Sequence, residues 1–244
     1  MDSRIVIIPT YNEKENIEKI IRYVFNLPEA FHILIIDDGS PDGTAAIVKG
    51  LMPEFEGRLF LEERQGKLGL GTAYIHGFKW CIERQYDFIF EMDADFSHKP
   101  DDLIRLHDAA VENQADAVVG SRYCNGVNVV NWPMSRILMS YFGSAYVRFM
   151  LRLPVHDTTA GFICYRRTLL EKLDFSRIRH TGYGFQIEMK YIIWKLGFNI
   201  MEIPIIFVDR KEGSSKMSSG IFKEAIWGVL RLRFRNVRKY LKNN

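Results

Sequence analysis

The stretch Phe88-Ile89-Phe90-Glu91-Met92-Asp93-Ala94-Asp95 joins an apolar run to two carboxylates that stand one residue apart. The apolar part is typical of a buried strand, so Asp93 and Asp95 follow the point where that strand leaves its sheet. In open α/β sheets, ligands bind at this carboxyl end. Two converging carboxylates there predict a hard divalent ion, Mg²⁺ or Mn²⁺, with substrate phosphates as further ligands. The alternative is a pair of loop or helix-capping aspartates, because an isolated Asp-x-Asp is a weak motif.

The segments around this stretch repeat the pattern of a buried strand followed by a helix. Residues 5–8, 33–36 and 117–120 are apolar runs, and residues 17–25 and 101–111 carry apolar side chains at helical spacing. The second run ends in Asp37-Asp38-Gly39-Ser40, so acidic residues end two strands of one predicted sheet. This alternation predicts an α/β fold, with a Rossmann-like, doubly wound, mostly parallel sheet and helices on both faces.

Length and composition limit the class of protein. A chain of 244 residues, 47% of them apolar, suits one α/β domain, or one domain plus an appendage. A net charge of +3 argues against a general nucleic-acid binder. The three cysteines are far apart and odd in number, which predicts neither a disulfide framework nor a zinc site and indicates a reducing compartment. We see no signal peptide and no membrane span, so we expect a cytosolic chain or one that lies on a membrane without crossing it.

An acid-free stretch separates Asp116 from Asp157. Among its many large apolar side chains it holds four arginines: Arg122, Arg136, Arg148 and Arg152. Aromatic side chains and arginines at one boundary are typical of a membrane interface. We therefore expect residues 123–154 to form a membrane-facing segment with an interfacial amphipathic helix. The alternative is a buried helical hairpin with snorkelling arginines.

The last residues predict a basic amphipathic helix over 220–244. Its apolar stripe consists of Phe222, Ile226, Leu230, Phe234, Val237 and Leu241. Such a helix binds either a membrane surface or a nucleic acid, and the apolar stripe favours the membrane.

Several strings run in the order of one known family and cover residues 4 to about 217. They are Pro9-Thr10-Tyr11-Asn12-Glu13, Asp37-Asp38-Gly39-Ser40-Pro41-Asp42-Gly43-Thr44, Met92-Asp93-Ala94-Asp95-Phe96-Ser97-His98, Gly120-Ser121-Arg122-Tyr123, Asp157-Thr158-Thr159-Ala160-Gly161-Phe162, Phe207-Val208-Asp209-Arg210 and Gly213-Ser214-Ser215-Lys216-Met217. Together they resemble the inverting glycosyltransferases of family 2 with a GT-A fold, and more closely the polyprenyl-phosphate (dolichol-phosphate) mannose synthases. The resemblance implies a catalytic domain over residues 1–219, of the type without C-terminal membrane spans.

The resemblance also implies an activity and a set of site residues. The activity is that of a metal-dependent dolichyl-phosphate mannosyltransferase, which moves mannose from GDP-mannose to a polyprenyl (dolichyl) phosphate. Asp93 and Asp95 would hold Mg²⁺ or Mn²⁺, and Arg122 and Arg136 the acceptor phosphate. Catalytic roles would fall to Asp95, Arg122 and Arg136. The nucleotide sugar would be bound by Pro9, Tyr11, Glu13, Ile36, Asp38, Asp93, Ala94, Arg210 and Lys216.

The residue chemistry agrees with this reaction. A phosphomonoester acceptor is already anionic near neutral pH, because its second pKa is about 6, so little general base is needed. The planar fork of an arginine positions phosphate, and a divalent ion at Asp93 and Asp95 would neutralise the leaving diphosphate. In-line attack at the sugar C1 then inverts its configuration. Glu188 is either a base or a structural carboxylate, and the pre-ionised acceptor favours the structural role. Ser97 stands where some family members carry glutamine, so a third protein ligand to the metal stays open.

Three other functions compete with this interpretation. One is the same chemistry with another sugar nucleotide, such as UDP-glucose. Another is a non-catalytic, membrane-bound nucleotide-binding module. The third is a nucleic-acid binder, against which the carboxylates argue because they would repel a phosphate backbone. We expect a peripheral protein on the cytoplasmic side of a membrane, with no nucleic-acid partner. The need for a membrane-anchoring partner protein stays open.

Overall fold

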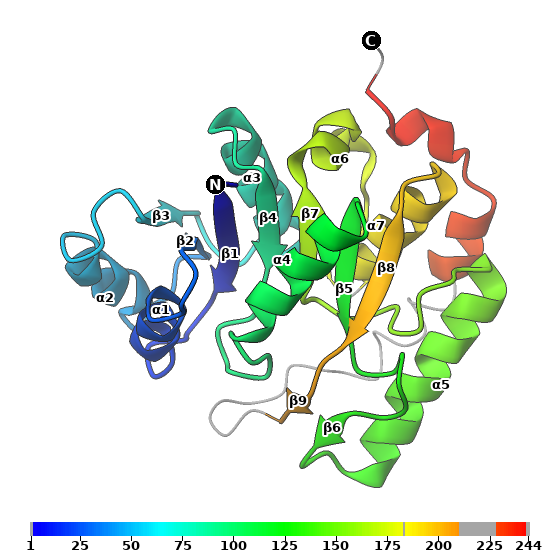
Figure 1. The fold of residues 1–244 in the computed structure, drawn as a ribbon, viewed down its shortest axis with the longest axis horizontal. Helices are drawn as coiled ribbons and strands as arrows, with labels where there is room; N and C mark the ends of the chain where they lie inside the picture. The colour runs from blue at the N-terminus through cyan, green and yellow to red at the C-terminus, as the bar shows by residue number, and fades with distance from the viewer. Residues whose placement is uncertain (1, 183, 210–227, 243–244) are drawn as a thin grey trace.

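The computed structural model describes residues 2–182, 184–209 and 228–242. Its centre is a seven-stranded sheet with the order β3-β2-β1-β4-β7-β5-β8 (Figure 1). The strands are β1 (Arg4–Thr10), β2 (His32–Asp37), β3 (Leu59–Glu63), β4 (Phe88–Glu91), β5 (Ala117–Ser121), β7 (Ile163–Arg166) and β8 (Ile200–Pro204). Neighbouring strands are parallel except around β7, which is antiparallel to both β4 and β5. The predicted mostly parallel, doubly wound α/β fold is thereby confirmed.

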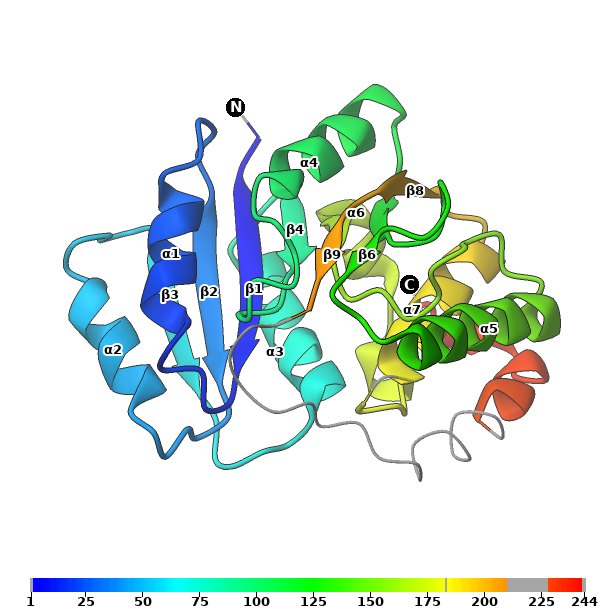
Figure 2. The ribbon, with the colours of Figure 1, turned by 90° about the horizontal axis from the view of Figure 1, so that it is seen from below.

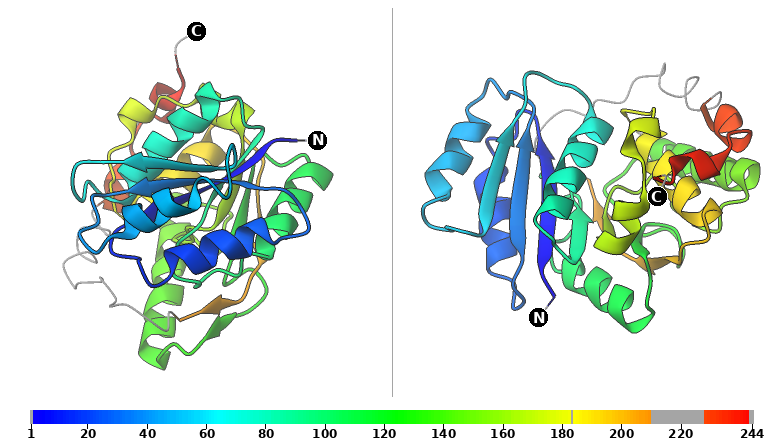
Figure 3. Two further views of the ribbon diagram at one scale, coloured as in Figure 1. Left: turned by 90° about the vertical axis from the view of Figure 1, so that its left-hand side faces the viewer. Right: turned by 90° about the horizontal axis from the view of Figure 1, so that it is seen from above.

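Helices cover both faces of the sheet (Figure 3). The alternation of side chains along β1 produces the two layers, because successive residues of a strand point to opposite faces. Val6 and Ile8 join one core, whereas Ile5 and Ile7 join the other. The first core is covered by α1 (Ile17–Phe25), α2 (Thr44–Leu51) and α4 (Asp102–Glu112). The second is covered by α3 (Leu70–Glu83), α6 (Arg167–Lys172), α7 (Gly184–Lys195) and the 3₁₀ helix η1 (Phe175–Arg177).

The acid-free stretch forms a short strand and one long helix. β6 (Val129–Val130) pairs with β9 (Phe207–Val208) in a small second sheet, and α5 (Met134–Leu151) follows, next to α7 in the view of Figure 2. Only Ser144, Val147 and Leu151 of α5 are buried. Its exposed large apolar residues are Met134, Leu138, Met139, Tyr141, Phe142 and Phe149. The interpretation as a buried helical hairpin is therefore wrong. Among the described helices, none is both long and apolar enough to cross a membrane.

The predicted continuous helix over 220–244 is wrong for the residues that the structure describes at this end. Residues 228–233 are helical, the chain then turns, and a separate 3₁₀ helix, η2, spans Val237–Tyr240. The side chain of Asn236 accepts a hydrogen bond from the backbone N–H of Arg238 and so starts η2. Local hydrogen bonds of this kind compete with helix continuation. The segment packs on the second core through Val229, Leu232 and Tyr240, so it is part of the globular domain.

Candidate active site

The parallel strands bring their functional residues to one edge of the sheet. Asp37 ends β2, Asp93 and Asp95 follow β4, and Arg122 follows β5. A cavity of about 460 Å³ opens there, between the sheet edge, α5 and the start of α7. Its lining includes four of the predicted site residues, Asp93, Asp95, Arg122 and Arg136. Both predicted metal ligands and both predicted acceptor-binding arginines thus share one cavity.

The donor set around Asp95 suits a hard divalent ion. Asp93 and Asp95 line the cavity beside Ser97 and His98, and the Ser97 backbone N–H donates to Asp95 Oδ1 at 3.0 Å. Within the described residues, the buried Ser97 Oγ and His98 Nδ1 have no hydrogen-bond partner. Burial lowers the pKa of His98 to about 4, so its imidazole is neutral. Two carboxylates with a nearby hydroxyl are donors that Mg²⁺ and Mn²⁺ accept, and phosphate oxygens and water usually complete such sites.

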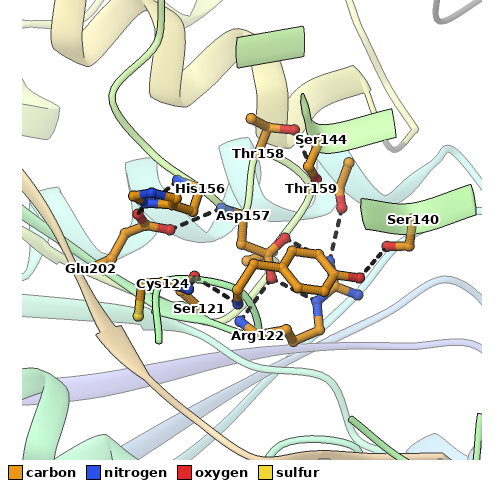
Figure 4. Close-up of polar contacts among 12 residues, drawn as sticks. Ser121, Arg122, Cys124, Ser140, Ser144, His156, Asp157, Thr158, Thr159 and Glu202 are labelled. Carbon is orange, nitrogen blue, oxygen red and sulfur yellow. Dashed lines mark hydrogen bonds and ion pairs between the residues drawn. The ribbon is translucent and has the colours of Figure 1, made fainter. Parts of the chain in front are cut away.

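Arg122 is held by a buried carboxylate. Its Nε donates to Asp157 Oδ2 and its Nη2 to Oδ1, both at 2.6 Å, and its backbone N–H also donates to Oδ2 at 3.0 Å (Figure 4). Burial acts to raise the pKa of Asp157, but the Arg122 guanidinium and its hydrogen bonds hold it below the usual value. The pair is a bidentate fork, the strongest common ion-pair geometry. Arg122 therefore reaches the cavity with a fixed orientation and with much of its charge already compensated.

Arg136 projects from the first turns of α5. It pairs with Asp209 at 2.8 Å and lies over the Trp132 ring, 4.1 Å from the ring centre. Asp209 follows β9, so this ion pair ties α5 to the small β6–β9 sheet. Like Arg122, Arg136 combines a position in the cavity wall with an existing carboxylate partner.

Five of the predicted nucleotide-sugar-binding residues, those expected at the guanosine part, lie at the ends of β1 and β2: Pro9, Tyr11, Glu13, Ile36 and Asp38. Pro9 and Ile36 are direct neighbours in the β1–β2 register. Asp38 is buried and accepts hydrogen bonds from Arg64 Nε at 2.7 Å and from the Leu68 backbone N–H at 3.2 Å. Tyr11 lies under Lys67, whose Nζ is 5.0 Å from the ring centre.

The cavity lining contains none of the residues predicted to bind the guanosine, which are Pro9, Tyr11, Glu13, Ile36 and Asp38. The buried Ala94 is likewise absent from it. Arg210 and Lys216 lie outside the described residues. The structure thus gathers the metal and acceptor candidates in the cavity, with the guanosine candidates at adjacent strand ends.

A buried polar network supports the floor of the cavity. Gln186 Nε2 on α7 donates to Glu91 Oε2 at 2.6 Å, and Lys190 Nζ donates to the carbonyl oxygen of Ala160, a lining residue, at 2.6 Å. Burial raises the pKa of Glu91 to about 8 and lowers that of Lys190 to about 8. The network connects β4, α7 and the loop before β7, so α7 fixes the shape of the cavity.

The sequence analysis missed two elements of the site. It gave no role to Asp157, although this residue begins one of the family strings. It also gave no role to residues 179–182, which line the cavity. Asp157 and its partner Arg122 are 35 residues apart in the chain. Arg179 and His180 are 9 and 8 residues from their partner Glu188. For Asp157, the available signal was an acid directly after the arginine-rich, acid-free stretch. For residues 179–182, the signal was the apolar surroundings of Glu188 in the sequence.

The comparison with protein families shows to which family this chain belongs. The model described as Glycosyl transferase family 2 matches residues 5–174, most of the chain. The chain belongs to glycosyltransferase family 2. The strings quoted from the sequence, from Pro9 to Phe162, lie within the matched region, so the family resemblance is confirmed.

Two curated relatives match almost the full chain. A protein of Mycolicibacterium smegmatis named polyprenol monophosphomannose synthase is 45% identical over 230 residues, which are 92% of this chain and 86% of the relative. A protein of Micrococcus luteus named undecaprenyl-phosphate mannosyltransferase is 44% identical over 227 residues, which are 93% of this chain and 92% of the relative. Both names specify a mannosyl product or activity and a polyprenyl-type lipid.

Solved structures support the GT-A fold. Glucosyl-3-phosphoglycerate synthase of Mycobacterium tuberculosis, in complex with Mn²⁺, UDP and phosphoglyceric acid, matches with a TM-score of 0.67 and 17% identity, covering 96% of this chain and 80% of that one. The same enzyme with Mg²⁺ and UDP matches with a TM-score of 0.63 and 19% identity, covering 95% and 79%. At this identity the likeness concerns the fold alone.

Proposed function

We propose that this protein transfers a mannosyl group from GDP-mannose to a polyprenyl phosphate, with inversion at the sugar C1. The observation that carries the proposal is the 44–45% identity to two mannosyltransferases of polyprenyl-type lipids over 92–93% of the chain. The cavity supports it independently, because it joins a carboxylate pair suited to a metal ion with arginines suited to phosphate. The donor base, the sugar and the metal ion are parts of this proposal.

The proposed reaction assigns work to a few side chains. Asp93 and Asp95 hold the divalent ion, which when bound offsets the negative charge that develops on the leaving diphosphate. Arg122 and Arg136 orient the acceptor phosphate, whose oxygen is ionised before it attacks and so requires no base. Asp157 keeps Arg122 in one rotamer, which reduces the entropy lost when the phosphate is aligned. Glu188 is buried behind the cavity wall and acts structurally in this scheme.

The proposal includes a membrane surface on the cytoplasmic side. A polyprenyl chain stays in the bilayer, because each buried CH₂ contributes about 0.8 kcal/mol. The enzyme must therefore approach the lipid headgroup. The α5 helix suits this contact, since it forms part of the cavity wall and exposes Phe142 and Phe149 by 63% and 80%. Arg148 and Arg152 accompany these rings in the sequence and would favour anionic lipid.

The direct test is incubation of the purified chain with labelled GDP-mannose and polyprenyl phosphate, followed by organic extraction of the lipid product. A parallel panel with UDP-glucose and UDP-mannose tests the alternative donors, and chelator with Mg²⁺ or Mn²⁺ added back tests the metal. The proposal expects label in the lipid phase with GDP-mannose and a divalent ion. Efficient transfer from UDP-glucose, with none from GDP-mannose, would replace the proposed function by the competing one.

A further inference from the structure

The loop of residues 179–182 forms part of the cavity wall. Arg179, His180, Thr181 and Gly182 all line the cavity. The carbonyl oxygen of Thr181 accepts a hydrogen bond from the Gly71 backbone N–H at 2.8 Å, which docks the loop on the start of α3. Gly69 also packs close to the loop, since a Cβ added there would lie 3.0 Å from the same oxygen. The loop thus lies between α3 and α7.

Glu188 fixes the backbone of this loop. Its Oε2 accepts from the backbone N–H groups of Arg179 and His180 at 3.1 and 3.0 Å, and it contacts His180 Nδ1 at 2.7 Å. Its Oε1 accepts from Arg235 and from the Tyr240 hydroxyl, at 2.9 and 2.8 Å. Burial acts to raise the pKa of Glu188, but these hydrogen bonds hold it below the usual value, so the carboxylate is charged. Charge-assisted hydrogen bonds from two directions set the point from which the Arg179 side chain leaves the backbone.

The other two arginines of the cavity each have a carboxylate partner, which Arg179 lacks within the described residues. Arg122 is paired with Asp157, and Arg136 with Asp209. Arg179 is exposed, and within the part of the chain that the structure describes its guanidinium makes no hydrogen bond or ion pair. Its backbone is therefore ordered by Glu188, while its charge is available to a ligand.

We propose that Arg179 is a phosphate-binding residue of this cavity. The inference rests on the proposed function and adds a third cation to Arg122 and Arg136. A guanidinium matches phosphate oxygens with two parallel N–H donors, and a preordered backbone lowers the entropic cost of using them. The ligand is a phosphate group, either of the donor diphosphate or of the lipid acceptor. The two sources differ in whether binding requires the lipid.

The test compares Arg179→Ala, Arg179→Lys and the matched control Arg177→Ala. Arg177 loses the same charge from the same segment, is also exposed, and is absent from the cavity lining. Titration calorimetry with GDP and Mn²⁺ measures the donor side, and KM for polyprenyl phosphate measures the acceptor side. Charged hydrogen bonds contribute about 1.5–3 kcal/mol, so Arg179→Ala should weaken one of these by about 10- to 100-fold. Arg179→Lys should fall between, because it keeps the charge and loses the fork.

The result assigns the phosphate or rejects the inference. Weaker GDP binding assigns the donor diphosphate, and a raised acceptor KM with unchanged GDP binding assigns the lipid phosphate. If Arg179→Ala matches Arg177→Ala in both measurements, the inference is overturned. Failure of the proposed function has a different signature, since the wild-type chain would then transfer no mannose. The same variants would in that case be compared with whichever donor is active.

Discussion

The two halves of the sheet place their charged residues differently. In the half made of β3, β2, β1 and β4, the interior is apolar and the charged groups gather at strand ends, as Asp38 does with Arg64. In the half made of β7, β5 and β8, buried charges lie in or behind the cavity wall, as in the Arg122–Asp157 pair and at Glu188. The first half is stabilised by apolar burial, which does little to orient the side chains at the strand ends. The second half couples its stability to the geometry of the site.

The largest effect is expected where the two halves meet, at the end of β4. Asp95→Ala removes one of the two proposed metal ligands. Because Asp95 belongs to neither core cluster, the fold should survive the change. Turnover should fall by about a thousandfold or more, because charge on the leaving diphosphate is no longer neutralised. Mn²⁺ titration calorimetry should show the matching loss of metal affinity. Full activity of this variant in chelator would remove the metal from the mechanism.

The contrast in stability is sharpened by Asp157→Asn. This change leaves the buried Arg122 without its anionic partner, which typically costs about 3–5 kcal/mol in the free energy of unfolding. Ile33→Val in the apolar half should cost about 0.5–1.5 kcal/mol, as a lost buried methyl group usually does. Urea unfolding at neutral pH measures both. Equal losses in the two variants would show that the buried ion pair has no special weight.

The exposed face of α5 offers a third comparison. The double change Phe142→Ser and Phe149→Ser should weaken binding to anionic liposomes by about tenfold, since about 1.4 kcal/mol of apolar contact is lost. Val111→Ser on α4, which is also exposed, serves as the control and should leave binding unchanged. Co-sedimentation across a lipid series gives the partition constants. If both variants bind like the wild type, another surface meets the membrane.

A further prediction concerns pH and Glu91, the last residue of β4. Because the native pKa of about 8 exceeds the usual value of 4.5, native Glu91 still holds between about pH 5 and pH 8 the proton that the unfolded chain has already lost. This group therefore makes the wild type less stable as pH rises through that window. Glu91→Gln does not titrate and retains an acceptor for Gln186. The free energy of unfolding of the variant, relative to the wild type, should increase from pH 5 to pH 8 in denaturant titrations. A difference independent of pH would mean that Glu91 ionises normally.

Sequence patterns were reliable where the determinants are local. The apolar runs and the acids behind them placed β1, β2, β4 and their functional ends, because strand burial and strand termination are encoded in consecutive residues. The family resemblance, rather than these local patterns, grouped Arg122 and Arg136 with Asp93 and Asp95, and all four residues line one cavity. The exposed apolar character of α5 followed from composition in the same way.

The patterns failed where distant residues decide the structure. The antiparallel position of β7 between β4 and β5 depends on pairings such as Phe90 with Cys164, which no periodicity reveals. The C-terminal pattern predicted one helix because its apolar stripe and its basic residues follow helical spacing. The helix instead ends at residue 233, the Asn236 side chain accepts from the Arg238 N–H at the start of η2, and Arg235 and Tyr240 turn inward to Glu188. The spacing of apolar and charged residues cannot predict that a charged residue such as Arg235 pairs with a buried carboxylate.

The antiparallel position of β7 between β4 and β5 has a consequence for how the wall of the cavity can change. Val119 on β5 and Ile163 on β7 are paired, so the chain that leaves the sheet after β5 returns to it at nearly the same place. Everything between them, including α5 and the Arg122–Asp157 pair, is one continuous excursion with adjacent ends. A segment with adjacent ends can be replaced by another of different length, because loop-closure entropy depends only weakly on the length of the segment. A sheet of this topology can thus keep the strand end that carries Asp93 and Asp95 while a single exchange of chain replaces much of the cavity wall that we propose to face the acceptor.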